Sequence, residues 1–207
     1  MKAIKLPLLY TVFMFTMLAP TIASCEDTSF SKTGLEFLES AFGYSDHTAK
    51  SLLSDDISID WYSDDLSTSE KKDKIISELK AFKDEYKIMS DCKYRSGYTD
   101  QIWGDDYATG FYSLGSNTEY LIVLYFEKNS CEEWRIEEIE LIEIKELNEE
   151  YKAEKKRLAK YIEEGDKDKI TEQKLNVKRA EELIESVTDL LSESQINEFK
   201  EIKAGKI

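Results

Sequence analysis

The 207-residue sequence has one histidine, His47, and three cysteines without a Cys-x-x-Cys pair. One histidine cannot build a His-based zinc site, and no dithiol redox motif is present. The sequence also lacks a Gly-x-Ser-x-Gly nucleophile motif, a glycine-rich phosphate loop and the spacing of an EF-hand calcium loop. No catalytic residue, metal site or cofactor is therefore predicted, and a non-catalytic role is favoured over an enzymatic one, which stays open.

Positive charge is scarce. The chain has 28 basic and 43 acidic residues, a net charge of −15. Residues 25–144 carry 12 Lys/Arg and 27 Asp/Glu, whereas residues 145–207 carry 14 and 16. Nucleic acid is excluded as a partner because phosphate binding needs a basic surface. A cationic protein or peptide, a metal ion or a small ligand is compatible with this charge, and so is a surface that only keeps an exported protein soluble.

Residues 1–24 have the features of a secretory signal peptide. Two lysines stand among the first five residues, and an uncharged apolar run over 8–19 is too short for a membrane span. Ile22-Ala23-Ser24-Cys25 resembles a bacterial lipobox, which predicts a palmitate-bearing lipoprotein anchored to a cell-envelope membrane through Cys25. The alternative is cleavage after Ala23, giving a soluble periplasmic or secreted protein.

The remaining two cysteines are Cys92 and Cys131. In an oxidising compartment they predict one disulfide, which would stabilise the fold by roughly 3–4 kcal/mol under the loop-entropy model. The alternative is a pair of reduced, buried thiols.

Aromatic residues divide the chain at about residue 144. All three tryptophans precede it, and only three aromatic residues follow it. We therefore predict a mixed head domain over 25–144 and a helical tail over 145–207. The two should be separable, so a chain ending near Ile144 is expected to stay folded.

Capping boxes and apolar spacing predict the helices. Boxes begin at Thr33, Ser67 and Ser192, Asp46 can cap a short helix, and Gly165-Asp166 separates two long tail helices. Alternating residues over 57–62 predict a strand, and β-rich runs separated by turn residues predict four more near 92–103, 107–114, 118–128 and 133–143. The run 120–126 is apolar on both faces, which is typical of a central strand.

Two local patterns are similar to a known family. Residues 53–61, Leu-Ser-Asp-Asp-Ile-Ser-Ile-Asp-Trp, look like a short helix running into a first strand, and Trp134-Arg135-Ile136 looks like a last strand. With the element order, they resemble the superfamily of ketosteroid isomerase, SnoaL-like cyclases and nuclear transport factor 2. The resemblance implies an α+β fold: a cone-shaped, curved antiparallel sheet packed by helices, here followed by a C-terminal helical hairpin.

In that superfamily the mouth of the cone holds the ligand pocket. Isomerase-like members combine a carboxylate base with tyrosine and protonated aspartate as hydrogen-bond donors. The candidates for such a set are Asp60, Tyr62, Tyr98, Asp100 and Tyr107. None of them matches a catalytic position of the family.

Three functions are compatible with these observations. The favoured one is an exported, lipid-anchored envelope protein whose head domain binds a ligand or protein without catalysis. The second is a small isomerase, dehydratase or cyclase of the SnoaL type. The third is an acidic inhibitor or immunity protein that neutralises a basic enzyme.

Overall fold

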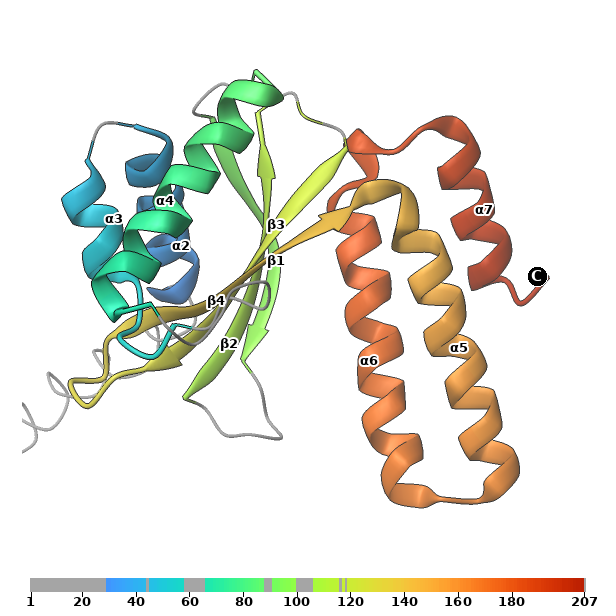
Figure 1. Cartoon of the computed structure of the whole chain (residues 1–207). Helices are drawn as coiled ribbons and strands as arrows, with labels where there is room; N and C mark the ends of the chain where they lie inside the picture. The colour runs from blue at the N-terminus through green and yellow to red at the C-terminus, as the bar shows by residue number, and fades with distance from the viewer. Residues whose placement is uncertain are drawn as a thin grey trace, which may run out of the picture.

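A computed structural model describes residues 29–43, 45–57, 66–87, 91–99, 106–115, 117 and 119–206. The fold is α+β, as predicted: a curved four-stranded antiparallel sheet with helices on both sides (Figure 1). The elements are, in order, α2 (Ser29–Phe42), α3 (Asp46–Leu52), α4 (Thr68–Glu85), β1 (Cys92–Thr99), β2 (Tyr107–Leu114), β3 (Tyr120–Lys128), β4 (Trp134–Glu143), the 3-10 turn η1 (Ile144–Glu146), α5 (Leu147–Glu164), α6 (Lys167–Ser186), the 3-10 turn η2 (Thr188–Leu190) and α7 (Glu193–Lys203).

The sheet is a meander with the order β1-β2-β3-β4. The strand β3 lies between β2 and β4, which confirms the central strand predicted over 120–126. After α3, Leu53 forms an isolated parallel bridge with Ile136 of β4, and the Ser54 N–H donates to the Ile136 carbonyl at 2.7 Å. The strand predicted over 57–62 lies outside the described residues from 58 onward.

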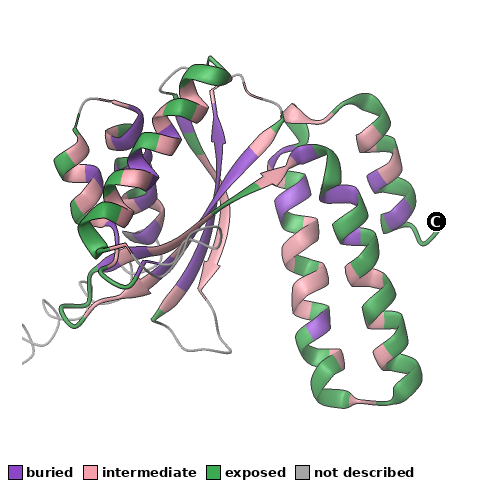
Figure 2. Cartoon of the chain, in the orientation of Figure 1, coloured by how far each residue is buried: buried purple, intermediate pink, exposed green. Residues whose placement is uncertain are grey.

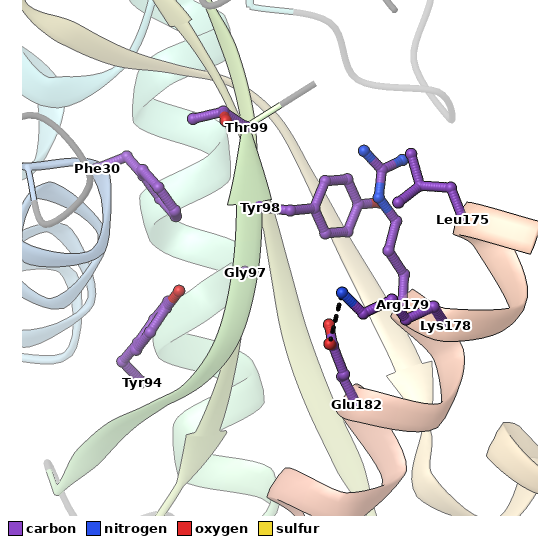
Figure 3. A pocket seen from close by; sticks show the side chains of 9 residues that line it. All are labelled: Phe30, Tyr94, Gly97, Tyr98, Thr99, Leu175, Lys178, Arg179 and Glu182. Atoms are coloured by element: carbon purple, nitrogen blue, oxygen red, sulfur yellow. Dashed lines mark ion pairs between the residues drawn. The ribbon is translucent and has the colours of Figure 1, made fainter. Parts of the chain in front are cut away.

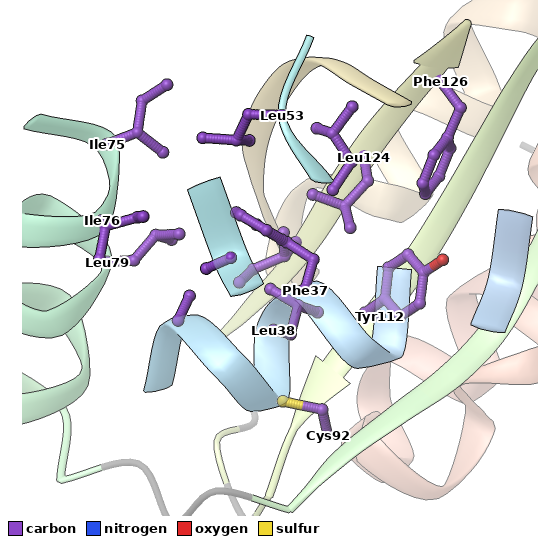
Figure 4. Packing of buried hydrophobic residues seen from close by; sticks show 14 of the residues in the cluster. Phe37, Leu38, Leu53, Ile75, Ile76, Leu79, Cys92, Tyr112, Leu124 and Phe126 are labelled. Atoms are coloured by element: carbon purple, nitrogen blue, oxygen red, sulfur yellow. The ribbon is translucent and has the colours of Figure 1, made fainter. Parts of the chain in front are cut away.

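Helices α2, α3 and α4 cover one face of the sheet (Figure 1). Phe37 and Leu38 of α2 are fully buried there against Tyr112 of β2 and Leu124 of β3 (Figure 4). The helix comes very close to the sheet, because a Cβ at Gly34 would lie 2.1 Å from the Tyr112 hydroxyl. Glycine at position 34 therefore lets the tyrosine ring reach under α2.

The tail covers the opposite face of the sheet. Phe111, Leu121 and Val123 of the central strands form one buried cluster with tail residues, among them Ile184 and Val187. Figure 2 shows this burial where the tail meets the sheet, while the far end of the α5–α6 pair is mainly exposed. The tail therefore completes a second core and is not a separate spacer.

Arg95 ties the tail to the edge strand β1. Its Nε donates to the Ser113 hydroxyl at 2.7 Å, and its terminal nitrogens donate to both carboxylate oxygens of Asp189 at 2.9–3.2 Å. The side chain of Arg95 is only 12% exposed, and such two-point guanidinium–carboxylate pairing fixes orientation as well as position. The contact holds η2, and with it the end of α6, against β1.

Most predicted helix boundaries are confirmed. Capping boxes are formed at Ser67 with Glu70 and at Ser192 with Gln195, and Gly165 ends α5 in the left-handed conformation at φ 73°. The predicted start at Thr33 is wrong, because α2 begins at Ser29. The earlier start adds the residue Phe30, which is only 3% exposed against the sheet, so tertiary packing overrides the local capping signal.

The second core changes the expectation for a shortened chain. Ending the chain near Ile144 would uncover Phe111, Leu121 and Val123, all of which are buried in the whole protein. Such a chain is now expected to lose solubility or cooperative unfolding, contrary to the separability predicted from the aromatic distribution.

Ile184→Ala should lower the free energy of unfolding by about 2–5 kcal/mol, because the side chain is 1% exposed and packs between tail and sheet. The matched control is Ile162→Ala on α5, where a 55% exposed isoleucine should change stability by about 0.5 kcal/mol or less. Denaturant titration followed by tryptophan fluorescence and by circular dichroism measures both. Equal effects of the two variants, or a head that unfolds separately from the tail, would contradict the shared core.

Candidate functional site

A cleft of about 380 Å³ lies between β1 and α6 (Figure 3). This volume falls within the range of ligand-binding pockets, roughly 300–1,000 Å³. Its walls combine three aromatic rings, a threonine, two cationic side chains and one carboxylate. The lining residues are Phe30, Tyr94, Gly97, Tyr98, Thr99, Leu175, Lys178, Arg179 and Glu182.

Arg179 is the distinctive residue of this cleft. Its guanidinium carbon lies 3.7 Å from the centre of the Tyr98 ring, a close cation–π stack (Figure 3). Its Nε is buried and has no hydrogen-bond partner among the described residues. By contrast, the neighbouring Lys178 forms an ion pair with Glu182 at 3.4 Å. The stack orients the guanidinium of Arg179 while leaving a hydrogen-bond donor unsatisfied.

The path of α6 creates the cleft. Near its C-terminus, Leu183 and Ile184 pack on the sheet, whereas another side of the same helix lines the cleft beside β1, through Leu175, Lys178, Arg179 and Glu182. Closer to the N-terminus of α6, Gln173 is buried against α5, and its side-chain amide donates a hydrogen bond to the Glu154 carbonyl at 3.1 Å. The C-terminal end of α6 is thus fixed to the sheet, and Arg179 reaches from α6 across the cleft to the Tyr98 ring on β1.

Of the five predicted pocket residues, only Tyr98 lines this cleft. Tyr107 instead donates to Glu127 at 3.1 Å, a hydrogen bond that raises the pKa of the phenol. Asp60, Tyr62 and Asp100 lie outside the described residues.

Tyr98 and Tyr107 lie on the same face of the sheet. Tyr98 pairs with Thr109, and Thr109 is two residues from Tyr107, so the three side chains share one face. That face is covered by the tail, because Tyr98 packs on the second core. Neither tyrosine therefore lies on the face of the sheet that α2, α3 and α4 cover.

The helix-covered side of the sheet is filled with apolar side chains (Figure 4). At its centre, the Tyr112 hydroxyl lies 3.4 Å from the carbonyl oxygens of Phe30 and Ser31. Burial raises the pKa of this phenol, so it stays protonated and acts as a hydrogen-bond donor. Tyr112 thus serves to dock α2.

A second cavity, of about 630 Å³, lies between the end of α3, α4 and the β3–β4 turn. Its cationic side chains, Lys72, Lys128 and Arg135, are each paired with a carboxylate. Lys72 binds Asp55 at 2.7 Å, and Arg135 binds Glu133 at 2.5 Å. Because these cations already have acceptors, this cavity is a weaker candidate than the cleft beside β1.

Carboxylates with a raised pKa lie away from the cleft. Burial raises the pKa of Glu137 on β4 and of Glu150 on α5, with nearby acidic residues adding to each shift. In the described part of the chain no group of three or more His, Cys, Asp or Glu residues is placed to hold a metal ion. None of the helices described there has the length and apolar character needed to cross a membrane.

Cys92 and Cys131 are both free, so the predicted disulfide is not formed. Cys92 pairs with Leu114 at one end of the sheet, whereas Cys131 lies in the turn beyond Lys128, at the other end. The length of β2 separates these ends by roughly 20 Å, and a disulfide needs Cα atoms within about 7 Å. Both cysteines lie within the meander, but three antiparallel strands, β1 to β3, run between them, so they lie at opposite ends of the sheet.

No family model matches this sequence, and no curated protein matches it. Among solved structures, the chain is similar to "Structure of Bdellovibrio bacteriovorus Bd1075", with 12% sequence identity and a TM-score of 0.38. The match covers 55% of this chain and 39% of that protein, so well under half of the latter is represented here. A likeness at this level carries no argument about fold or function.

The two described thiols should differ sharply in reactivity. Burial raises the pKa of Cys92 to about 12, whereas Cys131 is exposed. Because the thiolate is the reactive form, iodoacetamide at pH 8 should alkylate Cys131 in the folded protein and spare Cys92. Peptide mass mapping measures this, with unfolded protein as the control in which both react. Comparable labelling of Cys92 in the folded state would contradict the packing described for β1.

Proposed function

We propose that this protein is an exported, non-catalytic binding protein and that the cleft between β1 and α6 is its ligand site. The observation that carries the proposal is the state of Arg179. Its guanidinium is oriented by Tyr98 and has a buried donor without an acceptor in the described residues. An unsatisfied buried donor costs about 1–3 kcal/mol, which an acceptor on a ligand would recover.

The composition of the cleft favours a small ligand or protein segment bearing a carboxylate. Arginine pairs with carboxylates through two parallel hydrogen bonds, and the aromatic rings of Tyr94 and Tyr98 offer apolar contact area. The cationic partner predicted from the acidic head would contact other parts of the surface.

We also propose that residues 25–144 adopt the fold of the ketosteroid isomerase and nuclear transport factor 2 superfamily. Support comes from the order of elements and from the parallel bridge of Leu53 with Ile136, which brings the segment after α3 beside β4. A catalytic role gains no comparable support, because the cleft's carboxylate, Glu182, is engaged by Lys178. The acidic-inhibitor hypothesis stays a prediction from charge alone.

The proposed location at the cell envelope rests on the signal-like residues 1–24 and on the lipobox-like residues ending at Cys25. Expressed in a bacterial host, the protein should incorporate radiolabelled palmitate. Cys25→Ala should abolish the label, whereas the control Cys131→Ala should keep it. A labelled Cys25→Ala variant, or an unlabelled parent, would overturn the lipid anchor and favour a soluble exported protein.

The cleft can be tested with benzoate and its uncharged analogue benzamide as probes. Benzoate should shift the NMR signals of the Arg179 Nε–H and the Tyr98 ring, and benzamide should shift them less, because only the acid supplies a charged acceptor. Arg179→Gln should remove this difference.

Arg157→Gln is the matched control, since Arg157 lies on α5 outside the cleft and is paired with Glu154. The shifts should weaken with added salt. If neither benzoate nor other small carboxylates perturb any cleft residue, the proposed binding site is wrong.

A further inference from the structure

The cleft straddles the edge of one strand. Figure 3 shows Phe30 and Tyr94 on one side of β1, and Tyr98 with Arg179 on the other. Side chains alternate between the two faces of a strand, so a pocket lined from both faces must open along the strand's edge. A pocket buried beneath one face of the sheet would be lined from that face alone.

That edge is free to form hydrogen bonds in the described part of the chain. The strand β1 stands at the end of the sheet, and β2 is its only strand partner there. An edge strand presents a row of backbone N–H and C=O groups that can pair with another chain. Its register shifts between Tyr94 and Ser96, which leaves Ser96 to Thr99 as the regular stretch.

We infer that the cleft takes an extended peptide that adds to the sheet beside Ser96–Thr99 and places a carboxylate side chain on Arg179. This inference rests on the proposed function and names the ligand class for the same site. Strand addition supplies affinity through main-chain hydrogen bonds, and pockets for alternating side chains supply specificity.

The two flanks of the cleft set the peptide's sequence. One flank is aromatic, formed by Phe30 and Tyr94, whose rings are 6.2 Å apart. The other holds Arg179 stacked on Tyr98. Successive residues of an added strand point to opposite flanks, so an acidic residue and an apolar residue must be neighbours in the peptide.

The overall charge limits the number of acidic residues. The protein has a net charge of −15, which repels a strongly acidic peptide at long range. Within the cleft, Lys178 is already paired with Glu182, so Arg179 is the cation that lacks a described acceptor. The preferred peptide therefore carries one carboxylate among uncharged, strand-forming residues.

The test uses blocked seven-residue peptides of alternating valine and threonine with one central glutamate, labelled for fluorescence anisotropy. The whole protein should bind this peptide at least tenfold more tightly than the same peptide with glutamine or lysine at the centre. A peptide N-methylated at every second backbone nitrogen keeps every side chain but has no N–H donors along one of its two edges. Two such peptides, with the methyl groups on one edge or on the other, are compared. The peptide whose methylated edge faces β1 should lose binding.

Two variants separate recognition from folding. Arg179→Gln should reduce the glutamate-to-glutamine preference to about one, a ratio that partial unfolding would not change. Arg157→Gln, outside the cleft, should leave that preference intact. Circular dichroism of each variant confirms the fold.

Equal binding of the glutamate and glutamine peptides, or equal binding of all N-methylated forms, would overturn the inference. If no peptide binds while benzoate still shifts Arg179, the peptide inference fails and the proposed function stands. If neither the peptides nor benzoate reaches the cleft, both proposals fail.

Discussion

The central strands of this protein are buried on both faces, and the rest of the fold follows from that constraint. In β2, Ala108 to Leu114 are all buried, and so are Leu121 to Leu124 and Phe126 of β3. Apolar surface of this extent must be removed from water on each side, at roughly 25 cal/mol per Å² of area. One cover comes from α2, α3 and α4 and the other from the tail, so head and tail form one folded unit.

The candidate site lies at the edge strand β1, between the head helices on one side and the tail on the other. The end of α6 is held to the sheet by its apolar contacts and by Arg95, which binds Ser113 and Asp189. Toward the N-terminus of α6 the cleft lies between the helix and β1, and Arg179 reaches across it to stack on Tyr98. The same packing that buries the second face thus leaves an aromatic and cationic cleft open beside the first strand.

Sequence patterns predicted the elements well where the signal was local. The capping box at Ser67 needs only its own helix, and the left-handed Gly165 needs only its own turn. Two predictions failed where contacts between distant segments decide the outcome. Phe30 extends α2 beyond the Thr33 signal because the sheet buries it. Cys92 lies far from Cys131 because three antiparallel strands run between them and leave them at opposite ends of the sheet. Arg179 had no local signal at all, since its partner Tyr98 is about eighty residues away.

The sequence by itself determined the α+β class, the order of most helices and strands, the central position of β3 and the excess of acidic charge, because periodicity, turn residues and composition are properties of neighbouring residues. Only the tertiary structure decided that the tail covers the second face of the sheet and that Tyr98 points toward the tail. It also decided that Arg179 stacks on the Tyr98 ring and that the Arg179 Nε–H has no hydrogen-bond acceptor among the described residues. These features depend on contacts between distant segments, which form only when both faces of the sheet are buried at once.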